Sequence, residues 1–86
     1  MASPFEIQIV TPEKIVFSGE ASSAVVPAAD GYLGILPHHA PLLAALGKGR
    51  LEVVTVSEGT RTWNLSGGLL EIHSNHVSVL ADEVMD

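Results

Sequence analysis

Short apolar runs alternate with turn-forming residues along the whole chain. Residues 5–9 carry apolar side chains at every second position, which is typical of a strand with one buried face. Proline has no N–H to donate to a sheet, so Thr11 and Pro12 end this run, and the alternation resumes over residues 15–17. The chain therefore begins with two predicted strands that are joined by a turn.

Glycine and proline divide the next part of the chain. Ser18-Gly19 predicts a turn into a strand over residues 21–26, and Pro27 predicts the end of that strand. A second turn signal at residues 30–31 leads into another short apolar run over residues 32–36. We expect two short strands here, each limited by these residues.

Two hairpins are predicted in the second half. Residues 47–49 lead into a strand over residues 51–56, and a three-residue turn at 57–59 returns the chain into residues 62–65. With this loop length the apolar side chains of both strands share one face, whereas a two-residue loop would mix the faces. A two-residue turn at Ser74-Asn75 likewise sorts every pair of the last hairpin by polarity. The apolar pairs are Ile72 with Val77 and Leu70 with Val79, and the polar pairs are Glu71 with Ser78 and His73 with His76.

The pattern predicts an all-β fold. Only Pro41 to Leu46 resembles a helix, with proline at a first position and an alanine and leucine run behind it, and it is too short to be stable alone. We expect one domain over residues 1–86, a β-sandwich or flattened barrel of about eight to ten short strands.

Composition narrows the possible partners. The 86 residues are 47% hydrophobic and include four basic and ten acidic side chains and no cysteine. Disulfides and thiolate metal sites are excluded, and nucleic acid is a poor match because phosphate binding needs clustered cations. No apolar stretch is long enough to span a bilayer without interruption by proline and histidine. The apolar excess suggests that a partner covers part of the surface.

Candidate chemistry is sparse. The glycines at Gly67 and Gly68 precede a strand rather than a helix, so they predict a bulge or a positive φ and not a dinucleotide site. His73 and His76 face each other in the predicted hairpin, with Glu71 as a third ligand, and a small metal- or ligand-binding β-barrel protein is the alternative function. An exposed polar hairpin tip is the favoured interpretation, and no catalytic residue is predicted.

One predicted loop is unusually apolar. It runs from Asp30 to Leu46 and contains leucines, an isoleucine and Tyr32 beside glycine. Most of these side chains are expected to cap the core, but loops on rigid scaffolds often carry contacts, and tyrosine is a frequent interface anchor. The loop therefore predicts a protein-binding surface.

Three blocks of the sequence resemble the epsilon subunit of bacterial F-type ATP synthases. They are GYLGILPHHAPLLAALGKGRLEV, LSGGLLEI and VSVLAD, and the opening IQIVTPEKIVFSGEASSAVVPAADG is similar as well. The likeness is collinear from Phe5 to Asp82. It implies a ten-stranded β-sandwich and a non-catalytic subunit of the central stalk, without cofactor or metal, that couples proton or sodium translocation to ATP synthesis. Its implied partners are the gamma subunit and the c-subunit ring, at the cytoplasmic face of the bacterial cell membrane.

The resemblance also implies two contact surfaces. The surface that faces the c ring comprises Asp30, Gly31, Tyr32, His38 and His39. The surface that faces gamma comprises the segment around Thr11 and Pro12 and one face of the sandwich.

Most members of that family continue into two C-terminal helices. This sequence stops at Asp86, where the helices would begin, so we expect the N-terminal β-sandwich domain without the helical hairpin. A naturally short epsilon subunit and a piece of a longer one are both compatible with this length.

Overall fold

The computed structural model describes residues 3–85, and all of the regular elements in that range are strands. Three of the seven strands are 14 or 15 residues long, which is more than twice the usual length. The strands are β1 (Phe5–Val10), β2 (Ile15–Ala28), β3 (Gly31–Ile35), β4 (Leu42–Thr55), β5 (Gly59–His73), β6 (His76–Ala81) and β7 (Val84–Met85).

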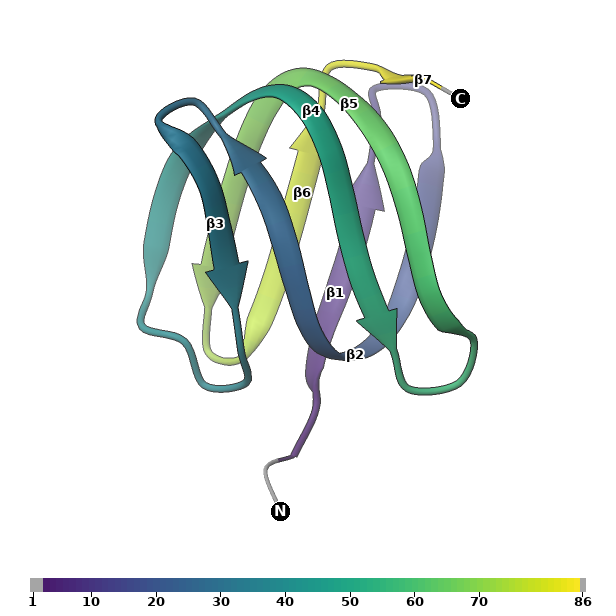
Figure 1. The fold of residues 1–86 in the computed structure, drawn as a ribbon, viewed down its shortest axis with the longest axis vertical. Coiled ribbons are helices and arrows are strands. Elements are labelled where there is room, and N and C mark those ends of the chain that lie inside the picture. Colours follow the sequence, from purple (N-terminus) through teal and green to yellow (C-terminus); the bar gives the residue numbers. More distant parts are fainter. Residues whose placement is uncertain (1–2, 86) are drawn as a thin grey trace.

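The strands form one sheet that closes on itself. The hydrogen-bonded order is β1-β6-β5-β4-β2-β3, β1 also pairs with β2, and β7 pairs with β5 (Figure 1). β1 and β6 run parallel, whereas the other pairings are antiparallel. Closure leaves β3 and β7 as short edges, which limits unpaired backbone.

The long strands divide this sheet into two packed layers. The first half of β2 pairs with β1, while its second half pairs with β3 and β4. β5 behaves in the same way, since its second half pairs with β6 and its first half with β7. We call the layer that contains β1 and β6 the β1 layer, and the layer that contains β3 and β7 the β3 layer. With β2, β4 and β5 counted once in each layer, the seven strands make the expected ten segments, and the all-β sandwich or flattened barrel is confirmed.

The inward side chains supply the core between the layers. Along β1 and β6 every second residue is buried, as the alternation predicted. The buried apolar residues are Phe5, Ile7, Ile9, Ala21, Ala24, Val26, Ile35, Leu46, Leu51, Val53, Leu65, Leu70, Ile72, Val77, Val79 and Ala81.

The predicted register of the β5–β6 hairpin is confirmed, whereas that of the β4–β5 hairpin is shifted by two positions. Ile72 pairs with Val77 and Leu70 with Val79 across a turn in which Ser74 and Asn75 have φ of 50° and 61°. Positive φ at both central residues belongs to a type I′ turn, which suits the twist of a two-residue hairpin. The other hairpin has a three-residue loop, Val56 to Glu58, which lies one position earlier than expected but keeps the same faces together.

Several predicted interruptions lie inside strands instead. Ser18-Gly19 continues β2, and Pro27 also belongs to β2. The β2–β4 ladder shifts register between Val25 and Ala28, so the missing N–H of Pro27 falls where regular pairing is already broken. The prediction that these residues end strands was wrong.

The predicted helix and the turn after it were also wrong. Residues 42–46 form the beginning of β4 instead. Leu42, Ala44 and Leu46 turn toward the core, and the residues between them are exposed. Gly49 lies inside β4. A side chain is excluded at this position because a Cβ would come within 2.8 Å of the Tyr32 hydroxyl and 2.9 Å of Pro27 Cβ. Close approach of a neighbouring strand, rather than a turn, accounts for this glycine. The predicted loop from Asp30 to Leu46 shrinks to residues 36–41.

Candidate protein-binding surfaces

An apolar row crosses the outer face of the β1 layer. Val10, Leu80, Leu69 and Ala45 are register neighbours on β1, β6, β5 and β4. Leu69 is 38% exposed and Leu80 is 41% exposed, although both lie within regular strands. Leu43, two residues before Ala45 on the same face of β4, is 66% exposed. A contiguous exposed apolar row across four strands is a feature that marks interaction sites.

The turn between β1 and β2 adjoins this apolar row. A hollow next to it is lined by Val10, Thr11, Pro12, Leu80, Ala81 and Asp82. The backbone N–H of Thr11 donates to the Lys14 carbonyl at 2.9 Å, and the Thr11 side chain is almost fully buried. Thr11 therefore closes the turn, whereas Pro12 is exposed and offers surface to a partner.

Asp30, Gly31 and Tyr32 lie together where β2 turns into β3. Gly31 has φ of 132°, a value that favours glycine at this turn. Tyr32 pairs with Pro27, and its hydroxyl accepts the N–H of Arg50 on β4 at 3.3 Å. The tyrosine thus lies over the second half of β2 and remains 63% exposed. It is an aromatic side chain fixed at its tip and open to a partner.

His38 and His39 lie at the other end of β3. In Figure 1 the β2–β3 turn is at the upper end of the sandwich, and the loop between β3 and β4 is at the lower end beside the β5–β6 turn. The N–H of His38 donates to Asn75 Oδ1 at 2.7 Å, and His39 Nδ1 lies 2.7 Å from the Ala40 carbonyl. The structure therefore splits the five residues of the expected c-ring surface into two groups.

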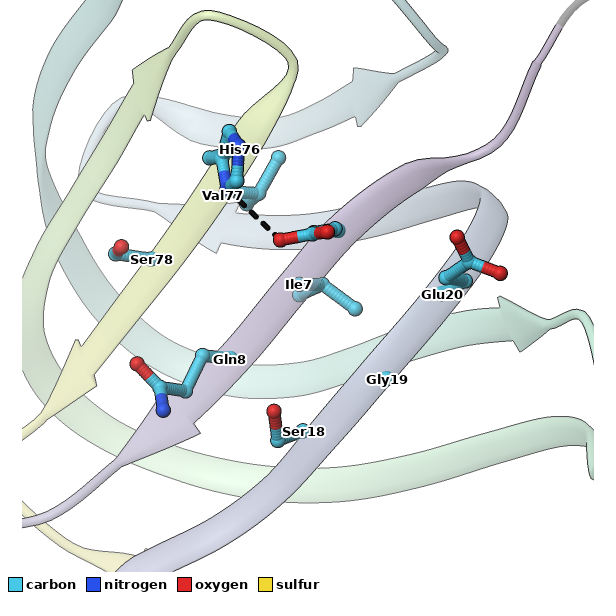
Figure 2. Close-up of a pocket in the computed structure, with 9 residues that line it drawn as sticks. Ile7, Gln8, Ser18, Gly19, Glu20, His76, Val77 and Ser78 are labelled. Carbon is cyan, nitrogen blue, oxygen red and sulfur yellow. Dashed lines mark ion pairs between the residues drawn. The ribbon is translucent and has the colours of Figure 1, made fainter.

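The two remaining histidines occupy the tip of the β5–β6 hairpin. His73 pairs with His76 in the register, as predicted. His76 Nδ1 lies 3.0 Å from Glu6 Oε1 of β1, and both side chains are more than half exposed. Both residues line a shallow hollow of about 350 Å³. Figure 2 shows the His76 side chain beside it. Within residues 3–85 no group of three histidine, aspartate or glutamate side chains is placed to hold a metal ion, so no observation favours the metal-binding alternative.

An aromatic cluster joins the two layers where β2 and β5 face each other without a ladder. The rings of Phe17 and Trp63 are 5.3 Å apart, and the Arg61 guanidinium lies 5.4 Å and 5.1 Å from their centroids. Arg61 also pairs with Glu58 at 2.6 Å. This cluster packs against the core, so we assign it to stability rather than to binding.

In the part of the chain that the structure covers, no helix has the length and apolar character needed to cross a membrane.

Comparison with known families decides the identity of this fold. Residues 4–86 match the model of the ATP synthase delta/epsilon chain β-sandwich domain. The chain belongs to this family.

Individual relatives of the delta/epsilon family agree with this assignment. An ATP synthase epsilon chain from Desulforamulus reducens is 48% identical over 84 residues, which cover 95% of this chain and 61% of the relative. The epsilon chain from Leptospira interrogans serovar copenhageni is 42% identical over 81 residues, which cover 94% and 63%. This chain thus spans about three fifths of these relatives, whereas for the Chlorobium limicola epsilon chain, at 38% identity, the match covers 91% of the relative.

Solved structures agree with the delta/epsilon fold. A chain of the Euglena gracilis mitochondrial ATP synthase matches with a TM-score of 0.88 and 16% identity, covering 99% of this chain and 54% of that one. A chain from the central stalk and c-ring structure of the Tetrahymena thermophila enzyme matches with a TM-score of 0.79 and 21% identity, covering 99% and 68%. At these identities the likeness concerns the fold.

The LSGG block of this delta/epsilon domain has a structural role. Gly67 and Gly68 have φ of 76° and 130°, as the glycine pair predicted, and they lie where β5 passes from one layer to the other. Gly68 pairs with Ala81 on one side and Leu46 on the other, so three strands meet closely there. The residues of the expected contact surfaces, by contrast, lie at outward positions and in turns. Sequence reasoning named Thr11 and Pro12 but missed Leu69 and Leu80, although the predicted hairpin register already pairs them.

Proposed function

We propose that this chain is the β-sandwich part of an epsilon subunit that acts, without catalysis of its own, in the central stalk of a rotary ATP synthase. It binds the gamma subunit and the c-subunit ring, and it couples proton or sodium translocation to ATP synthesis. Family membership supports this role, as do the relatives that are named ATP synthase epsilon chain. The structural neighbours come from assemblies described by their central stalk, F1 and c ring. The site of action is the cytoplasmic face of the bacterial cell membrane, within the complex.

The apolar row carries the assignment of a gamma-facing surface. Ala45, Leu69 and Leu80 are exposed in the isolated chain, whereas Val10 is half-buried. The hollow beside Pro12 continues the row toward the β1–β2 turn. Burial of such side chains gives roughly 25 cal/mol per Å² of apolar surface removed from water. A subunit that covers this face of the β1 layer would gain that free energy. This account fits the apolar composition noted above, and it makes one face of the sandwich, with Thr11 and Pro12 at its border, the gamma side.

Asp30, Gly31 and Tyr32 form the main proposed contact with the c ring. Tyr32 combines a large apolar ring with a hydroxyl, and the hydrogen bond from Arg50 limits its freedom before binding. His38 and His39 form a second contact area, at the opposite end of β3 from Asp30. Since the two areas are separate, the contribution of each is tested by its own variants.

A closed sheet suits a part that transmits torque. The layers share β2, β4 and β5 as continuous strands, so displacement of one layer relative to the other would strain backbone hydrogen bonds as well as side-chain packing. The sandwich can therefore pass force from a ring contact at one surface to a stalk contact at another with little internal deformation.

Binding to purified gamma subunit tests the proposal. Changing Leu69 and Leu80 together to glutamine should weaken the complex about 30-fold or more, because each leucine contributes about 1 kcal/mol or more when its exposed part is buried. Thr62→Gln, on the outer face of the β3 layer, is the matched control and should bind as the unmodified chain does. Equal affinity of the double variant would refute the assignment of this face. If the unmodified chain neither binds gamma nor restores coupling to epsilon-depleted enzyme, the proposed function itself is wrong.

A further inference from the structure

Asn75 connects three segments that are distant in the sequence. Its side-chain Oδ1 accepts the N–H of His38 at 2.7 Å, and its Nδ2 donates to the Pro4 carbonyl at 3.0 Å. Its own backbone carbonyl accepts the N–H of Glu6 at 3.2 Å. One residue at the hairpin tip therefore holds both the start of the chain and the loop between β3 and β4.

The loop between β3 and β4 needs such support. His38 has φ of 63°, a left-handed conformation that is uncommon for residues with a Cβ. The 2.7 Å bond to Asn75 fixes the N–H of this same residue. Without that bond, the backbone at His38 is expected to relax toward negative φ, which would redirect the side chains of His38 and His39.

We propose that Asn75 is a positioning residue that holds the His38–His39 loop in the orientation presented to the c ring. This inference rests on the proposed function, because it takes that loop as a contact area. Asparagine satisfies all three local requirements at once. It tolerates the φ of 61° that the turn needs, its oxygen accepts from His38, and its amide group donates to Pro4.

Two substitutions separate these requirements. Asn75→Gly keeps the positive φ of the turn but removes both side-chain hydrogen bonds. Asn75→Asp keeps an acceptor for the His38 N–H but removes the donor to the Pro4 carbonyl. A role of Asn75 in the turn alone predicts no change in Asn75→Gly. A role through the loop predicts that Asn75→Gly loses the hydrogen bond that holds the His38 N–H and that Asn75→Asp retains this hydrogen bond.

Amide hydrogen exchange on the 86-residue chain measures directly how strongly the His38 amide in the loop is protected. In Asn75→Gly the His38 amide should exchange about fivefold faster, which corresponds to the loss of one ordinary hydrogen bond. The Glu6 amide should not change, because its acceptor is the backbone carbonyl of residue 75. In Asn75→Asp the His38 amide should keep its protection. Unchanged exchange at His38 in Asn75→Gly would overturn the proposal.

Reassembly with epsilon-depleted ATP synthase tests the consequence for binding. His38→Ala with His39→Ala should weaken reassembly about tenfold, and Asn75→Gly should weaken it by a similar factor. When the three changes are combined, Asn75→Gly should add nothing further, because its effect acts through the loop. An additive effect would refute a positioning role. If the unmodified chain does not assemble at all, the proposed function fails, while the exchange experiment still decides whether Asn75 holds the loop.

Discussion

Replacing Gly68 by alanine should be far more damaging than the single added methyl group suggests. A Cβ at this position would collide with the Leu80 carbonyl oxygen and would lie 2.9 Å from Ala81 Cα. Both are backbone atoms of β6, so no side-chain rotation relieves the contact. Gly68 also has φ of 130°, which alanine rarely adopts. Strand β5 would have to move away from β6 where it passes between the layers.

The magnitude follows from these two terms. An unfavourable φ costs about 1–2 kcal/mol for a residue with a Cβ. Relief of the contact would break the backbone pairing of Gly68 with Ala81, and each lost hydrogen bond costs about 1 kcal/mol or more when its groups stay buried. We expect a loss of about 4 kcal/mol or more. A domain of this length has a free energy of unfolding of about 4–13 kcal/mol, so Gly68→Ala should remove a large fraction of the total stability.

Two other glycines separate the terms. Gly59 has φ of 70° with open space around the position of a Cβ, so Gly59→Ala should lose only the backbone term, about 1–2 kcal/mol. Gly34 has open space and no positive φ, so Gly34→Ala should be neutral or stabilising by about 0.5 kcal/mol. Equilibrium unfolding in urea measures all three variants, provided that the slope of each transition is unchanged. If Gly68→Ala loses no more free energy than Gly59→Ala, the close contact with β6 is not real.

Two further predictions concern the core and the surface. Leu51 is fully buried, so Leu51→Ala should lower the free energy of unfolding by about 2–5 kcal/mol in the same urea assay, and a loss under 1 kcal/mol would contradict its core position. Tyr32→Ala should cost less than about 1 kcal/mol in stability because the side chain is 63% exposed, yet it should weaken seating on the c ring in reassembly assays. A stability loss without a change in reassembly would show that Tyr32 serves the fold.

The sequence predicts local pairing well because short-range rules determine it. In the β5–β6 hairpin a two-residue turn and the side-chain alternation leave one register that buries every apolar pair, and the structure has that register. The long strands are a different case. Ser18-Gly19 and Pro27 are ordinary turn signals, but here β2 continues through them. A glycine within a strand reflects the approach of a neighbouring strand, and that neighbour is known only once the sheet is assembled.

The same limit applies to the contact surfaces. His38 follows Asp30 by only eight positions in the sequence, and the family resemblance placed them on one expected surface. Strand β3 lies between them and extends about 3.3 Å per residue over its five residues, so the two groups end up far apart. The partnership of His76 with Glu6 was missed for a related reason, since it depends on the parallel pairing of β1 with β6.

The apolar row, however, does have a signal in the sequence. Strict alternation places polar residues at outward positions, so two consecutive apolar residues in a strand put one of them outside. Each member of the row lies at such a break: Val10 follows Ile9, Ala45 precedes Leu46, Leu69 precedes Leu70, and Leu80 lies between Val79 and Ala81. One break is ordinary, because folded proteins expose many single apolar side chains. Four breaks that the register aligns on neighbouring strands form one surface. Breaks in the alternation that align on neighbouring strands therefore locate the proposed gamma-facing surface more directly than any motif does.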